Sequence, residues 1–126
     1  MAEVYKVLIF LKRKPGLSIA EFRDYYENRH RHLGEKYGQG MLLKYRRNYV
    51  DPVPNNETGQ SGELDFDVIT EMWFDREAYA KAILDLGTKM EFPADVLADE
   101  ENVFDRSKTR YAGVVEFESD LPPVNP

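Results

Sequence analysis

The chain has 126 residues, a formal net charge of −6 and no cysteine. This length fits one domain around one core, and the lack of cysteine excludes disulfides, thiolate metal sites and cysteine nucleophiles. The acidic balance argues against nucleic-acid binding, because neutralising phosphates requires a basic surface. No apolar run approaches the roughly 20 residues of a membrane span, and no signal-peptide pattern is seen. We therefore expect a cytoplasmic protein without nucleic-acid or membrane partners.

The pattern of apolar residues predicts alternating strands and helices along the chain. Residues 3–12 form a predicted strand that is apolar on both faces, and Pro15-Gly16 turns the chain into the first helix. Asp75 is expected to cap the second helix, and Pro93 to lie in the first turn of a third. We expect strands at residues 3–12, 41–50, 66–74 and 111–118, helices at residues 18–33, 76–86 and 91–104, and a surface loop at residues 52–62.

The main elements follow the order β-α-β-β-α-β, which is typical of a ferredoxin-like α+β fold with a four-stranded antiparallel sheet. We assign residues 1–120 to this single domain and residues 121–126 to a C-terminal tail. Two helices cover one face of such a sheet, yet the first strand is apolar on both sides. The simplest way to bury the other face is to pack it against a second copy of the chain, so a homodimer is predicted.

The predicted helix at residues 18–33 carries both histidines of the chain. Ser18 and Glu21 have the spacing of a capping box at its start. At about 100° per residue, His30 falls on one apolar stripe, and His32 points roughly 200° away among charged residues. The stripe consists of Ile19, Phe22, Tyr26, His30 and Leu33.

A lone imidazole on an apolar face has two interpretations. It packs in the core with its hydrogen bonds satisfied, or it exchanges protons with a ligand at neutral pH, since its ordinary pKa is near 6.5. Burial would favour the neutral form, which is the form a general base needs. The acidic run at residues 99–101 is interpreted as a solvated face rather than a metal site, because hard-cation sites converge oxygens from several segments.

The segment FLKRKPGLSIAEFRDYYENRHRHL resembles the opening of EthD-domain proteins in the dimeric α/β-barrel superfamily. LLKYRRNYV, DVITEMWFD and DEENVFD match later segments in the same order, so the resemblance covers roughly residues 5–117. It implies a homodimer of ferredoxin-like subunits with no metal, flavin or other cofactor. It also implies a pocket between the sheet and the helices of each subunit.

Site residues carry over from this resemblance by position. His30 matches the helix histidine of the motif, and Tyr45 matches a strand tyrosine that lines the pocket in the methylmuconolactone methylisomerase of the family. Met72 stands where that enzyme has a cysteine, which removes a thiol, and Trp73 follows it. We expect a substrate-binding pocket built from Phe22, Tyr26, Tyr45, Met72 and Trp73, with His30 as the acid/base. Core packing is the alternative for Tyr45, and core or dimer-interface packing is the alternative for Trp73.

The resemblance implies proton-transfer chemistry on small, cyclic or aromatic, oxygenated compounds. Our preferred interpretation is a cofactor-independent lyase or isomerase, dehydratase- or cyclase-like, in which His30 moves the proton. Two alternatives stay open. One is a binding or accessory protein of a catabolic or polyketide pathway, and the other is a cofactor-free monooxygenase.

Overall fold

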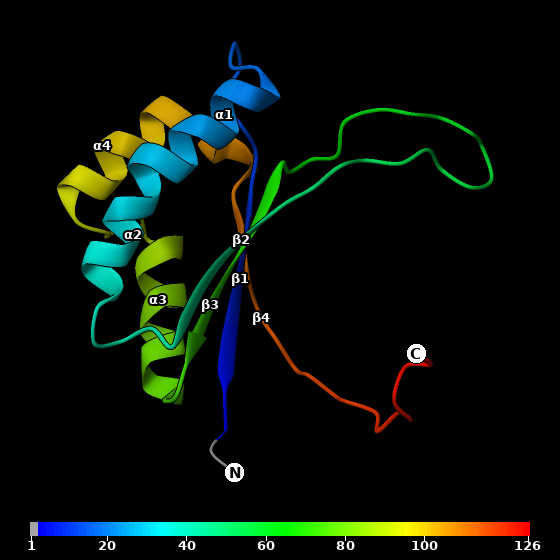
Figure 1. Cartoon of the computed structure of the whole chain (residues 1–126). Helices are drawn as coiled ribbons and strands as arrows, with labels where there is room; N and C mark the ends of the chain where they lie inside the picture. The colour runs from blue at the N-terminus through cyan, green and yellow to red at the C-terminus, as the bar shows by residue number, and fades with distance from the viewer. Residues whose placement is uncertain (1–2) are drawn as a thin grey trace.

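The computed structural model describes residues 3–126 and has the predicted ferredoxin-like α+β fold. The sheet has four antiparallel strands in the order β2-β3-β1-β4. Its strands are β1 (Tyr5–Leu11), β2 (Lys44–Tyr49), β3 (Val68–Phe74) and β4 (Arg110–Gly113). Figure 1 shows the helices gathered on one side of this sheet.

The helical layer consists of a long N-terminal helix and two shorter ones. The long helix runs from Ile19 to Gly38, but its middle turn is a π-helix, so it divides into α1 (Ile19–Tyr25), η1 (Tyr26–His30) and α2 (Arg31–Gly38). The other helices are α3 (Glu77–Thr88) and α4 (Ala94–Val103), and a 3₁₀ turn, η2 (Arg106–Lys108), precedes β4.

Strand pairing sets which residues face the helices. Val7 pairs with Met72, and Met72 pairs with Tyr45, so these three side chains share the helix-facing side. Side chains one position along, such as Lys6 and Trp73, point to the opposite face because side chains alternate along a strand. The core lies between the sheet and the helices, and Phe22 is its central aromatic, completely buried against the rings of neighbouring aromatic residues.

Of the two helix caps predicted from the sequence, one is present in the structure and the other is not. The capping box is present: the Ser18 hydroxyl accepts a hydrogen bond from Glu21 N, and the Glu21 carboxylate accepts one from Ser18 N. The predicted cap at Asp75 is wrong. The N-cap of α3 is Arg76, without a side-chain cap bond, and the Asp75 carboxylate lies 3.8 Å from the Arg76 guanidinium instead.

Two other expectations need correction. The sequence pattern predicts the last strand at residues 111–118, but β4 ends at Gly113, because as an edge strand it pairs only with Val7–Phe10 of β1. The pattern also places Ile19 on the buried stripe of the first helix, yet Ile19 is 42% exposed at the helix start, and burial along this helix begins at Phe22.

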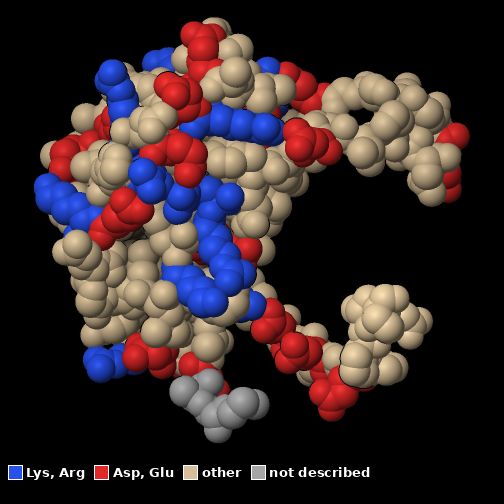
Figure 2. All heavy atoms as spheres, viewed as in Figure 1, with Lys and Arg blue, Asp and Glu red and all other residues tan. Residues whose placement is uncertain are grey.

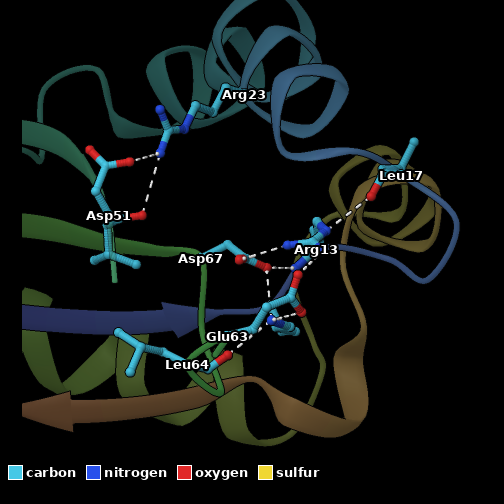
Figure 3. Close-up of polar contacts among 9 residues, drawn as sticks. Arg13, Leu17, Arg23, Asp51, Glu63, Leu64 and Asp67 are labelled. Carbon is cyan, nitrogen blue, oxygen red and sulfur yellow. Dashed lines mark hydrogen bonds and ion pairs between the residues drawn. The ribbon is translucent and has the colours of Figure 1, made fainter. Parts of the chain in front are cut away.

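Ion pairs hold the two ends of the long loop between β2 and β3 against the body of the protein (Figure 3). Arg13 donates to Leu17 O at 2.9 Å and to the Asp67 carboxylate at 3.0 Å, and it also pairs with Glu63. Arg23 on α1 donates to the Asp51 carboxylate at 2.9 Å. Between these anchors the loop projects away from the sheet (Figure 1).

The sheet face opposite the helices carries a cationic cluster around Trp73. The Lys6 ammonium, the Arg46 guanidinium and the Lys44 ammonium lie 4.1, 4.6 and 5.0 Å from the Trp73 ring centroids. Figure 2 shows the body of the protein with the β2–β3 loop and the C-terminal segment extending from it as two arms. Phe117 in the C-terminal segment is 93% exposed.

Candidate functional site

A cavity of about 270 Å³ lies between the helical layer and the sheet. Its lining is largely apolar, with a few polar side chains that converge from different elements. The sheet contributes Ile9, Leu11, Tyr45, Met72 and Tyr111, the long helix contributes Tyr26, His30, Leu33, Gly34, Tyr37 and Gly38, and the remaining lining residues are Met41, Leu42, Ile83, Leu86, Phe92, Pro93, Val96, Glu100 and Phe104.

The π-helical turn places two functional side chains in this cavity. Tyr26 and His30 are the first and last residues of η1, and both are buried. Their rings pack edge-to-face with centroids 5.2 Å apart, and both rings also pack against Phe104. An inserted π turn widens a helix locally and is frequently found at functional sites. This turn therefore directs both rings from the helix into the layer where the cavity lies.

His30 is held by a carboxylate on α4. Its Nδ1 lies 2.9 Å from Asp99 Oδ2, and the Tyr25 hydroxyl donates to Asp99 Oδ1 at 2.5 Å. A carboxylate accepts hydrogen bonds, so Nδ1 carries the proton of the neutral ring and Nε2 carries the lone pair. No residue among 3–126 forms a hydrogen bond to Nε2, which leaves it available to a ligand.

Burial lowers the pKa of His30 below its ordinary value of 6.5, while the hydrogen bond and charge of Asp99 oppose that change. The imidazole is therefore neutral at pH 7. Asp99 also gives partial compensation to the imidazolium that forms when Nε2 takes a proton. This combination of a neutral resting state and a stabilised charged state is what general-base chemistry needs.

Three hydroxyl groups form a chain at the sheet side of the cavity. The Tyr26 hydroxyl lies 2.7 Å from Thr70 Oγ1 and 3.1 Å from the Tyr45 hydroxyl. Burial raises the pKa of Tyr45 to about 12 and that of Tyr26 well above its ordinary value. Both phenols therefore stay protonated and can donate a hydrogen bond to a ligand oxygen or to each other.

An ion pair beside the cavity fixes Tyr45. The Arg47 guanidinium binds the Glu27 carboxylate with two hydrogen bonds of 2.8 and 3.0 Å, and the Tyr49 hydroxyl donates to the same carboxylate at 2.6 Å. Arg47 also donates to Tyr45 O at 3.0 Å, and its guanidinium lies 5.0 Å from the centroid of the Tyr45 ring. Two-point contacts of this kind are rigid, so the Tyr45 ring has a defined position.

Glu100 contributes a carboxyl group to the cavity wall. Burial raises the pKa of its carboxyl to about 7, and the nearby Asp99 adds to the rise while Arg106 opposes it. The site therefore combines an imidazole with a lowered pKa and a carboxyl with a raised pKa. Pairs of groups shifted in this manner are typical of acid/base sites.

The structure brings together four of the six site residues predicted from the sequence. His30, Tyr26, Tyr45 and Met72 all line the cavity, whereas Phe22 and Trp73 do not. Phe22 lies one helical turn before Tyr26 and is enclosed by core aromatics. Trp73 follows Met72 on β3 and therefore points to the other face, where it donates from Nε1 to Glu71 at 3.1 Å.

Asp99 and Glu100 are residues of the candidate site that sequence reasoning misses, because it interprets the acidic run as a solvated face. The spacing of apolar residues along α4 indicates that Glu100 faces the interior. Phe92, Val96, Glu100 and Val103 recur every three or four residues, which places Glu100 in an apolar stripe. A carboxylate within such a stripe is a candidate for burial. Asp99 has no comparable signal, because its partner His30 is 69 residues away.

Within residues 3–126, no three His, Asp or Glu side chains cluster in a manner suited to a metal ion. Likewise, none of the helices in this part of the chain is both long and apolar enough to cross a membrane.

The fold and cavity define a ferredoxin-like α+β protein with a largely apolar site between sheet and helices. The sequence matches the EthD domain family over residues 14–107, and the chain belongs to this family. Its fold is similar to that of an EthD family protein from Bacillus halodurans C-125 (18% identity, 90% and 99% of the two chains covered, TM-score 0.56). An EthD-like protein from Ralstonia eutropha JMP134 is comparable (17%, 96% and 100%, TM-score 0.56).

A hydroxynitrile lyase from Passiflora edulis shares the fold at 14% identity, with 96% of this chain and 100% of that chain covered and a TM-score of 0.51. No curated protein matches the sequence.

Proposed function

We propose that this protein binds a small, oxygenated cyclic or aromatic compound in the cavity and acts on it as a cofactor-independent lyase or isomerase. His30 Nε2 removes a proton from the bound compound, and the Tyr45 hydroxyl donates a hydrogen bond to the oxygen on which negative charge develops. The observation that carries the proposal is the hydrogen bond between His30 Nδ1 and Asp99, inside a largely apolar cavity.

The geometry supports this division of roles. Asp99 fixes the tautomer of His30, so that the basic nitrogen is the one left for the ligand. The Tyr45 phenol stays protonated because its pKa is raised to about 12, so it acts as a donor. The apolar walls suit a cyclic ligand, which displaces water from the cavity when it binds. Glu100 lines the cavity with a pKa of about 7, and we assign to it the return of the proton as a general acid.

The fold comparison is compatible with lyase chemistry. A hydroxynitrile lyase shares the architecture. Cleavage of a hydroxynitrile removes the hydroxyl proton and breaks the C–C bond, which releases cyanide and a carbonyl compound without a redox step. An aromatic hydroxynitrile therefore joins cyclic ketones, lactones and phenols in the panel of compounds that we would test.

Deuterium exchange tests the proposal even where the reaction product is unidentified. The panel is incubated with the protein in D₂O, and NMR follows both ligand binding and exchange of acidic C–H protons. We expect at least one compound to bind and to exchange or react faster with the protein present. His30→Gln should retain binding and lower the rate by roughly 10²–10⁴-fold, the usual share of a general acid or base.

His32→Gln is the matched control. His32 lies two residues along the same helix, is 58% exposed and contacts Glu35 rather than the cavity. It should leave the rate unchanged. Binding without exchange or turnover for any compound would favour the accessory-protein alternative, and consumption of dissolved oxygen would favour the monooxygenase. An unchanged rate in His30→Gln would contradict the catalytic role of His30.

A further inference from the structure

The open face of the sheet is cationic, although the chain as a whole has a net charge of −6. Side chains alternate along each strand, so the strand register shows which charged residues lie on this face. They are one carboxylate, Glu71, and four cations, Lys6, Lys44, Arg46 and Arg110. Positive charge is therefore concentrated on the one sheet face that the helices leave uncovered.

Lys44 and Arg46, both on the edge strand β2, have no acidic partner within residues 3–126. Their cationic groups lie 5.0 and 4.6 Å from the Trp73 ring centroids instead. Glu71 is opposite Arg46 in the register, but its carboxylate accepts hydrogen bonds from Trp73 Nε1 and Asn48 Nδ2. Lys44 and Arg46 are both exposed, so carboxylates of another molecule have access to them.

The C-terminal arm, residues 114–126, has the complementary composition. It contains Glu116, Glu118 and Asp120 and no Lys or Arg. Its large apolar side chains, which include Phe117 and Leu121, are between 81% and 94% exposed. Glu116 pairs with Lys6 at the base of the arm, and beyond this contact the arm leaves its own sheet (Figures 1 and 2). Exposed apolar side chains that lie together in this manner mark an interaction surface.

We propose that two copies of the chain exchange their C-terminal arms, so that the arm of each copy lies on the open sheet face of the other. Glu118 and Asp120 of the arm pair with Lys44 and Arg46 of the other copy, and Phe117 packs on the apolar part of that face. A second copy is the occupant because one chain carries both complementary surfaces, which a two-fold axis brings together twice. The arm thereby becomes part of the interface rather than a free tail.

A charge swap tests whether the arm contacts the other copy. The face variant is Lys44→Glu/Arg46→Glu, and the arm variant is Glu118→Lys/Asp120→Lys. Sedimentation equilibrium at low salt measures the dimer Kd, because salt screens exposed ion pairs. Each variant alone should raise the Kd by at least about 10-fold, since like charges then meet across the interface. An equimolar mixture restores opposite charges in both contacts and should associate at least about 10-fold more tightly than either variant alone.

Lys81→Glu/Lys89→Glu is the matched control, because it changes the net charge as the face variant does but lies on α3, on the helical side. Its dimer Kd should stay within about 3-fold of the wild-type value. A monomeric wild-type protein would overturn the proposal, and so would a face or arm variant that dimerises as tightly as the wild type. A mixture that associates no more tightly than its components would show that the arm acts within its own chain, which also contradicts exchange.

Phe117→Ala tests the apolar part of the contact. Phe117 is 93% exposed in one subunit, so its loss should leave the fold intact, yet it should raise the dimer Kd by at least about 10-fold if the ring is buried on the other copy. An unchanged Kd would contradict the proposal. This variant and the arm variant keep the test valid even if the face variant fails to fold. None of these residues lines the cavity, so the proposed chemistry stands or falls separately.

Discussion

Replacement of Glu100 by Gln should stabilise the protein at alkaline pH and have little effect at acidic pH. Burial raises the pKa of Glu100 from 4.5 to about 7, so the folded state holds a proton that the unfolded state releases over this range. The stability that is present below pH 4.5 is therefore lost as the pH rises to about 7. Glutamine keeps the shape of the side chain and has no charge to bury.

The magnitude follows from the pKa. A rise from 4.5 to about 7 corresponds to about 3 kcal/mol, at about 1.36 kcal/mol per pKa unit. Because Glu100 is partly exposed in the cavity wall and keeps some contact with water, we expect a gain of about 1–3 kcal/mol in the free energy of unfolding at pH 8.5. At pH 4 the carboxyl is protonated in both states, and the two proteins should differ by less than about 0.5 kcal/mol.

Urea unfolding at the two pH values measures this difference, provided that the slope with denaturant is unchanged. Glu101→Gln is the control, because Glu101 is the next residue on α4 and its side chain is 71% exposed. It should change stability by less than about 0.5 kcal/mol at either pH. A Glu100→Gln protein that gains nothing at pH 8.5, or gains as much at pH 4, would refute the assignment of Glu100 as a partly buried carboxyl with a raised pKa.

Three further predictions concern packing and assembly. Phe22→Ala should lower the free energy of unfolding by about 3–5 kcal/mol because Phe22 is fully buried, whereas Ile19→Ala should lower it by less than about 1 kcal/mol; chemical denaturation compares the two. Gly34→Ala should displace the Tyr45 ring, because a Cβ at position 34 would lie 2.5 Å from the Tyr45 hydroxyl. Weaker binding of a panel compound that binds the wild-type protein would report this displacement. Light scattering should show a homodimer, with twice the chain mass of 14.7 kDa. Leu8 lies on the open face of the sheet, so Leu8→Glu should dissociate this dimer. A stable wild-type monomer would contradict the prediction.

Local patterns are enough to predict the fold. Strand and helix order follows from apolar periodicity and from turn residues such as Pro15 and Gly16, which act over a few positions. The errors fall at element ends, where tertiary pairing decides. β4 stops at Gly113, opposite Val7, although β1 continues to Tyr5, and α3 begins without the predicted Asp75 cap.

The sequence predicts the orientation of site residues that lie on one helix, but it does not predict contacts between residues on different elements. Tyr26 and His30 belong to one helical stripe, so their shared orientation follows from the sequence. Met72 and Trp73 are neighbours on a strand, and alternation allows only one of them to face the helices, which the structure resolves in favour of Met72. Asp99 reaches His30 through the packing of α4 on the long helix, which no local pattern encodes.

An NMR titration of His30 is the most direct test of the central claim that this residue presents a basic Nε2 to the cavity. In ¹⁵N-labelled protein, the ring nitrogens report both the tautomer and the pKa. We predict a neutral ring with the proton on Nδ1 and a pKa below 6.5, which Asp99→Asn lowers further because the Asp99 carboxylate opposes the effect of burial. A proton on Nε2 in the neutral ring, or a pKa above 6.5 that Asp99→Asn does not change, would contradict the account.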